Sequence, residues 1–251
     1  MTFTAALIAS LVIALVLAAL HLAAPRIRKL PLVPESVTGS FAGGLAVAYV
    51  FLHLLPEIAE GNEAIGELLE DTIEVTPLFD LGIFVVALTG FTVFYGLDRL
   101  ATSRRTSKRP DSAGVYWLHL GAFAFYNALI TYTMALRVET GYLFAILFAI
   151  AMGLHFVLTD RHLEENYPHR FAASGRVVLA GALLLGWLLS ALFAPTSTVV
   201  VAILTALLGG SVLLNVFKEE LPSNRGSSFP WFLAGMVLYS VLLALITAAA
   251  E

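Results

Sequence analysis

The longest uncharged stretch of the chain runs from Val177 to Phe217 and contains no Asp, Glu, Lys, Arg or His. A membrane-spanning helix needs roughly 20 apolar residues, so this stretch is too long for one span. Its middle is interrupted by Ala-Pro-Thr-Ser at 194–197. Proline ends the preceding helix, and Thr or Ser can cap the next one. The pattern predicts two helices joined by a tight turn.

The rest of the chain repeats this apolar character. Of the 251 residues, 59% are hydrophobic and 13% are charged, whereas soluble domains carry roughly 25% charged residues. The sequence therefore predicts an all-α polytopic membrane protein, a bundle of eight transmembrane helices in a single domain over residues 1–251. The expected spans are 3–24, 38–55, 78–97, 115–136, 140–159, 177–194, 197–217 and 229–249.

The composition also excludes several classes of protein. The chain has no cysteine, which rules out disulfides, thiolate metal sites and cysteine nucleophiles. Disordered and nucleic-acid-binding chains need polar or basic sequence, which is missing here. The first span lacks a basic region before it and is about twice as long as the apolar part of a signal peptide. We expect it to stay in the protein, as in a prokaryotic inner-membrane protein.

Charges alternate between successive connections, and this alternation predicts the topology. Of the 14 Lys and Arg residues, all but Arg137 fall in the first, third, fifth and seventh connections. Basic residues favour the cytoplasmic side of a membrane. This side is therefore expected to be cytoplasmic, with both termini extracytoplasmic. The basic stretch 99–109 is expected to be a solvated loop, with contact to anionic lipid head groups as the alternative.

All charged residues of the second connection are acidic. They are Glu57, Glu60, Glu63, Glu67, Glu70, Asp71 and Glu74. We expect a solvated outer loop, kept flexible by Gly61 and Gly66. The functional alternative is an electronegative mouth that concentrates cations.

Ionisable and amide side chains within or at the ends of the spans are the candidate site residues, because such groups are costly at membrane depth and usually functional. Spacing i, i+4 puts His53 and Glu57 on one helix face, a reasonable half-site for a divalent cation. Each candidate also has a purely structural interpretation, as a solvated side chain, a partner in a helix–helix hydrogen bond or a member of an interfacial ion pair. The candidate metal-site residues are Asn127, His155, Asp160, His53, Glu57 and Glu219.

Sequence signatures of enzymes are absent. The chain has no His-x-x-x-His, His-Glu-x-x-His, Gly-x-Ser-x-Gly or Walker A pattern. We therefore expect no enzymatic activity and no tightly bound cofactor. An intramembrane hydrolase would need His155, Asp160 and His162 to converge around a metal, and Asp160 and His162 at i, i+2 do not face each other.

Two local patterns resemble the ZIP family of divalent-metal transporters. His-Leu-Leu-Pro-Glu at 53–57 is similar to the end of that family's second helix. Gly-Gly-Ser-Val-Leu-Leu at 209–214, followed by Glu-Glu-Leu-Pro at 219–222, resembles its seventh helix. The resemblance implies eight spans with both termini outside, and a metal centre between helices 4 and 5. A homodimer would also follow from it.

The family's metal centre is only partly retained. Asn127 and His155 match the resemblance, and Asp160 can match an acid that some members carry one residue later. Family ligands, a glycine and a proline are replaced by Tyr126, Ile130, Thr131, Phe156, Leu158 and Thr159. One imidazole, one amide and one carboxylate form a poor zinc site, since zinc prefers about four ligands.

Two functions follow as expectations. The first is a ZIP-like permease that moves divalent cations toward the cytoplasm, with zinc as the main candidate and iron or manganese as others. The metal ion is then a transported substrate, and the other expected partner is membrane lipid. Cations would pass His53 and Glu57, meet Asn127 and His155, and leave past Asp160, His162, Glu164, Glu165 and Glu219. The second is a ZIP-fold membrane protein that no longer transports metal and serves as a scaffold, a regulator or a carrier of another solute.

Overall fold

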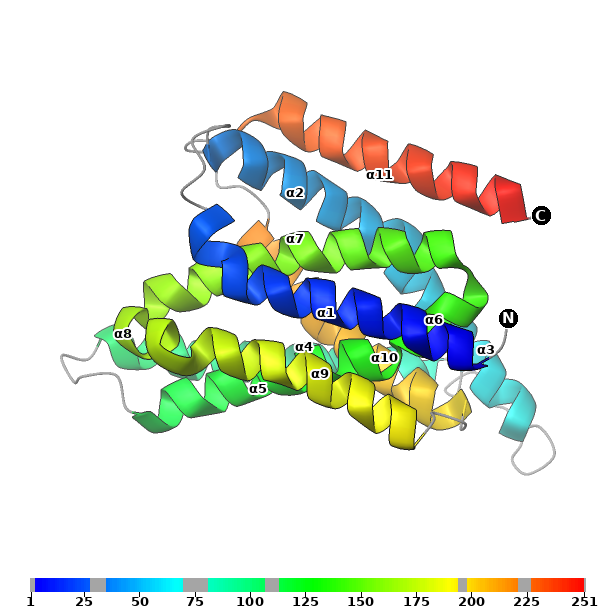
Figure 1. Cartoon of the computed structure of the whole chain (residues 1–251), viewed down its shortest axis with the longest axis horizontal. Coiled ribbons are helices and arrows are strands. Elements are labelled where there is room, and N and C mark those ends of the chain that lie inside the picture. The colour runs from blue at the N-terminus through cyan, green and yellow to red at the C-terminus, as the bar shows by residue number, and fades with distance from the viewer. Residues whose placement is uncertain are drawn as a thin grey trace.

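The computed structural model describes residues 3–27, 35–69, 81–106, 113–193, 198–220 and 227–250. These residues are helical with short connections and contain no β-strand, so the all-α prediction is confirmed. The helices are α1 (Phe3–Ile27), α2 (Glu35–Tyr49), α3 (Leu55–Leu69), α4 (Gly82–Thr106), α5 (Ala113–Tyr132), α6 (Met134–Thr140), α7 (Tyr142–Asn166), α8 (Pro168–Arg170), α9 (Arg176–Leu192), α10 (Thr198–Asn215) and α11 (Phe229–Ala250). The long helices run along the bundle, with the start of α1 and the end of α11 at the same end as α3 and α6 (Figure 1).

Six helical segments among the described residues are long and apolar enough to cross a membrane. They are Phe3–Ile27, Val37–Asn62, Gly82–Leu100, Tyr142–Glu165, Val199–Lys218 and Phe229–Ala248. Large apolar side chains are exposed along them, for example Leu88 and Leu245, as expected for surfaces that face lipid. The chain is thus a membrane-integral protein. The expected spans at 115–136 and 177–194 correspond to α5 and α9, which are helical but are not among the six.

Glycines allow three pairs of helices to approach closely. A Cβ atom on Gly44 of α2 would overlap the Phe232 carbonyl of α11. A Cβ on Gly90 of α4 would overlap the Leu207 carbonyl of α10. A Cβ on Gly186 of α9 would overlap the Ala128 carbonyl of α5. Small residues let backbones pack together in membranes, where the hydrophobic effect between helices is absent.

The prediction that the acidic stretch after His53 is a loop is wrong for residues 57–69. The helix continues as α3 through Leu69, and Gly61 and Gly66 are helical. Pro56 cannot donate a backbone hydrogen bond, and a π turn, η1 (Val50–Leu54), precedes it. The helix therefore passes the proline instead of ending there. Glu70, Asp71 and Glu74 lie outside the described residues.

The other breaks fit the sequence. α9 ends at Leu192 and α10 begins at Thr198, so the two helices predicted from the long uncharged stretch are confirmed; the expected turn residues 194–197 lie outside the described part. The connection after α5 is a short helix, α6, bounded by Thr133 and Gly141. The Thr133 hydroxyl donates to the Leu129 carbonyl at 3.2 Å, a bond that often bends helices.

Candidate functional site

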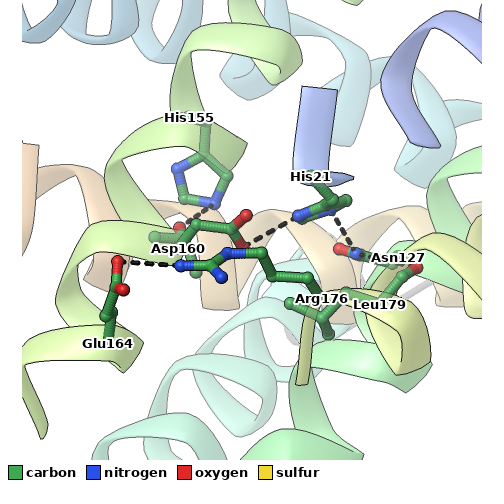
Figure 2. Close-up of polar contacts among 8 residues, drawn as sticks. His21, Asn127, His155, Asp160, Glu164, Arg176 and Leu179 are labelled. Atoms are coloured by element: carbon green, nitrogen blue, oxygen red, sulfur yellow. Dashed lines mark hydrogen bonds and ion pairs between the residues drawn. The ribbon is translucent and has the colours of Figure 1, made fainter. Parts of the chain in front are cut away.

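Three buried polar side chains from three helices meet in the bundle, and we call His21, Asn127 and Asp160 the central triad. The Asp160 Oδ1 atom of α7 lies 2.8 Å from Nδ1 of His21 on α1. The other ring nitrogen of His21, Nε2, lies 2.9 Å from Nδ2 of Asn127 on α5. All three side chains are almost fully buried. Figure 2 shows the imidazole bridging the carboxylate and the amide.

The hydrogen bonds define the roles of the triad atoms. In this orientation the Asn127 amide nitrogen can only donate, so Nε2 of His21 accepts. The proton of the neutral imidazole is then on Nδ1, which donates to Asp160. The amide nitrogen also lies 3.5 Å from the Leu179 carbonyl of α9. His21 therefore bridges a carboxylate and an amide.

The second carboxylate oxygen of Asp160 has no hydrogen-bond partner among the described residues, although it is buried. The side chain of Arg176 extends past Asp160 (Figure 2). Its terminal nitrogen, however, pairs with Glu164 Oε2 at 2.8 Å. With Asp160 ionised, these three side chains carry one more negative than positive charge. A buried carboxylate with a free oxygen is costly and attracts a cation.

His155 lies on the same helix as Asp160 but makes different contacts. Its Nε2 atom is 3.4 Å from the Thr159 hydroxyl, and its ring lies 5.7 Å from the ring of Tyr126. Phe156, which stands where the ZIP resemblance implies a ligand, stacks on the His21 ring with 4.6 Å between centroids. Aromatic packing therefore fills part of the space that ligands would use.

The candidates His53 and Glu57 lie in a second group, together with Arg137. Glu57 Oε2 accepts a hydrogen bond from Arg137 Nη1 at 2.8 Å. The guanidinium carbon of Arg137 is also 4.2 Å from the centre of the Phe148 ring. The His53 ring lies 5.6 Å from Tyr49 and 6.4 Å from Phe144. His53 and Glu57 thus contact Tyr49, Phe144 and Arg137 rather than the triad.

Arg137 is a buried cation that keeps its charge. Burial by itself would lower the pKa of its guanidinium, but the carboxylate of Glu57 raises it, and the net pKa lies above the ordinary arginine value. Its Nε atom has no hydrogen-bond partner among the described residues. Removing Glu57 would therefore leave a desolvated positive charge without compensation.

The remaining candidates lie toward the other end of α7 and α10. Glu164 pairs with Arg176, and Glu165 Oε1 accepts from Arg161 Nε at 2.8 Å. Arg161 is thus paired with Glu165, whereas Asp160 is bonded to His21. Glu219 lies in the π turn η4 (Val216–Glu220). The side chains of Glu219 and His162 are outside the described part.

His21 is the functional candidate that the sequence reasoning missed. A single histidine in an otherwise uncharged span is a signal in itself, because ionisable residues at membrane depth are rare. His21 lies in the span Phe3–Ile27, and no other polar side chain lies within four residues of it in the sequence. It therefore forms no local motif with a recognisable spacing. Its partners Asn127 and Asp160 are more than 100 residues away in the sequence.

No group of three or more His, Asp or Glu side chains in the described parts of the chain is placed to hold a metal ion. The triad of Asp160, His21 and Asn127 comes nearest to a set of metal ligands. Both ring nitrogens of His21, however, already make hydrogen bonds within the protein. Comparison with protein-family models, with curated proteins and with solved structures gave no significant match.

Proposed function

We propose that the chain is a membrane permease with eight spans and extracytoplasmic termini that moves a divalent metal cation toward the cytoplasm. The observation that carries the proposal is the buried, unpartnered Oδ2 atom of Asp160 beside the imidazole of His21. A charged group at this depth is expensive and usually marks an ion pathway. The excess negative charge around Asp160 favours a cationic substrate over an anionic one.

Binding of the cation would use the donors that surround this oxygen. A carboxylate oxygen, an imidazole nitrogen and an amide oxygen suit zinc, iron(II) and manganese(II) to different degrees. To use His21, the cation must displace either the hydrogen bond to Asp160 or the one to Asn127. Water molecules would fill the remaining ligand positions. Such a site binds weakly, which suits a carrier that must release its cargo.

The acidic helix α3 supplies the entrance in this proposal, and Glu219 lies near the exit. No nucleotide-binding motif is present in the sequence. The flux would therefore run down the electrochemical gradient of the metal, which for a divalent ion includes the membrane potential.

The test is metal flux into proteoliposomes that contain the purified chain, with Zn²⁺, Mn²⁺, Fe²⁺ and Co²⁺ offered in turn. We expect flux with at least one metal, and its loss in Asp160→Asn, which removes the charge but keeps the shape. Glu139→Gln, at an exposed position, is the matched control and should keep the wild-type rate. Absence of flux across the whole panel would refute the permease.

A second candidate, a metal-free membrane protein of the same architecture, is favoured by one observation. Both nitrogens of His21 are satisfied within the protein, and Phe156 packs on its ring. Elemental analysis of the detergent-purified protein distinguishes the two functions. The permease predicts bound metal that is reduced in His155→Ala and Asp160→Asn, whereas the metal-free protein shows none in any variant.

A further inference from the structure

The starting observation is the position of Arg137. It is the one base among 14 that falls outside the predicted cytoplasmic connections. It is also buried, with 8% of its surface exposed. An isolated arginine on the extracytoplasmic side would ordinarily be solvated, because burying its charge is costly. Its burial therefore requires an explanation.

Residues from several helices surround this guanidinium. Arg137 lies on α6, its ion-pair partner Glu57 on α3, and the ring below it, Phe148, on α7. Tyr49 of α2 packs edge to face against Phe148 and against Tyr239 of α11, with 5.8 and 6.3 Å between ring centroids. Arg137 is thus bonded to α3 and stacked on α7. Breaking its bond to Glu57 would release α6 from α3 at this point.

Glu57 is also the carboxylate that the sequence predicts as a binding group for an incoming cation. The guanidinium of Arg137 occupies it at 2.8 Å. A cation arriving from the acidic end of the bundle must therefore compete with a positive charge that the protein itself supplies. Divalent charge and coordination by His53, one turn away on the same segment, would favour the cation in this competition.

The local backbone permits the guanidinium to withdraw. α6 has seven residues and ends at Gly141, whose backbone is extended, whereas backbone hydrogen bonds of the helical i→i−4 type continue from α5 into α6 through Thr133. A shift of α6 would therefore turn about Gly141 and bend the helix at Thr133, whose hydroxyl donates to the Leu129 carbonyl.

From these observations we propose that the Arg137–Glu57 ion pair is the extracytoplasmic gate of the protein, closed by Arg137 as a tethered cation and opened when a divalent cation binds Glu57. The proposal rests on the membrane orientation proposed above. It does not require that metal crosses the membrane, so it can fail or hold separately from the permease.

The absence of native cysteine makes thiol accessibility a clean test. Ala151 is buried on α7, one turn from Phe148 and one turn from His155, so Ala151→Cys reports on the space between the gate and the triad. Thr140→Cys, at an exposed position on α6, reports access to the outer surface. Both are treated in intact cells with a membrane-impermeant methanethiosulfonate.

The labelling rate of Ala151→Cys follows the fraction of open molecules. We expect slow labelling with the native pair, and labelling faster by about tenfold or more in Glu57→Gln or Arg137→Gln, because a buried ion pair shifts such an equilibrium by at least this factor. Millimolar Mn²⁺ should accelerate labelling with the native pair and have little effect in Glu57→Gln. Glu60→Gln, an exposed acid on the same helix, is the matched control and should label slowly.

Several results would overturn the gate. Unchanged labelling of Ala151→Cys in both neutral variants would do so, provided that Thr140→Cys still reacts. Equal acceleration in Glu60→Gln would do so as well, because it would indicate a general effect of surface charge. If the neutral variants fail to fold, the Mn²⁺ experiment with the native pair decides, and labelling of Ala151→Cys that Mn²⁺ does not accelerate refutes the gate. If Thr140→Cys reacts only in inside-out vesicles, the orientation is reversed and the same comparison is made there.

Discussion

The close contact between α4 and α10 gives a prediction whose magnitude follows from two glycines of one helix. Gly90 lies against the Leu207 backbone, and an added Cβ would overlap the carbonyl group. Gly96, six residues later on α4, has no atom within 4 Å of such a Cβ. The same Gly→Ala substitution therefore meets a backbone in one case and open space in the other.

The two effects can be estimated separately. Alanine is favoured over glycine in a helix interior by about 1 kcal/mol, and this gain applies at both positions. Overpacking costs about 1–3 kcal/mol, and the upper end applies at Gly90 because a backbone carbonyl cannot change its rotamer. The net result is a loss of about 2 kcal/mol for Gly90→Ala and a gain of about 1 kcal/mol for Gly96→Ala.

The assay is thermal unfolding of both variants in the same detergent. For a chain of this length 1 kcal/mol shifts the Tm by about 2–4 °C. Gly90→Ala should therefore lower the Tm by about 4–8 °C and Gly96→Ala should raise it by about 2–4 °C. Equal Tm values for the two variants would refute the reasoning, because they would mean that α4 and α10 are not in backbone contact at Gly90.

Two further predictions concern buried hydrogen bonds. His21→Leu should destabilise the protein by about 1.5–3 kcal/mol because it removes a hydrogen bond to the buried Asp160 carboxylate. The double variant His21→Leu with Asp160→Leu should recover most of this loss, and a double variant no more stable than the single one in denaturant titration would contradict this. Trp187→Phe removes the bond from the indole N–H to the Leu7 carbonyl at 3.0 Å and should lower stability by about 1 kcal/mol, measured as a Tm shift against Trp117→Phe at an exposed position.

The apolar runs and the proline at 195 predicted much of the fold, because helices and their breaks depend on local sequence. The path after His53 was predicted incorrectly. The expected span ended at residue 55, but the helix continues through Pro56 after a π turn, and no local sequence pattern predicts that turn.

The candidate site was predictable only for residues that lie within a predicted span and match a local sequence pattern. Asn127 and Asp160 were identified and do meet, but through His21, whose partners lie on other helices. Arg137 was counted as a loop residue, and its partner Glu57 is 80 residues away. Such pairings depend on tertiary packing, and no local pattern in a single sequence indicates which distant residues will meet.

The three π turns in the described part of the chain have a consequence for comparing this protein with others. Each of them, η1, η3 (Phe171–Gly175) and η4, lies next to charged side chains, among them Glu57 and Arg176. A π turn contains one residue more than the α-helical turn that it replaces, and each residue of an α-helix turns the chain by about 100°. Deleting one residue within Val50–Leu54 would convert the π turn to an α turn and keep Glu57 directed toward Arg137, whereas deleting one residue between Leu55 and Glu57 would rotate the rest of α3 by about 100°. Correct alignment with a distant relative should therefore place single-residue gaps at these turns, within helices rather than in loops.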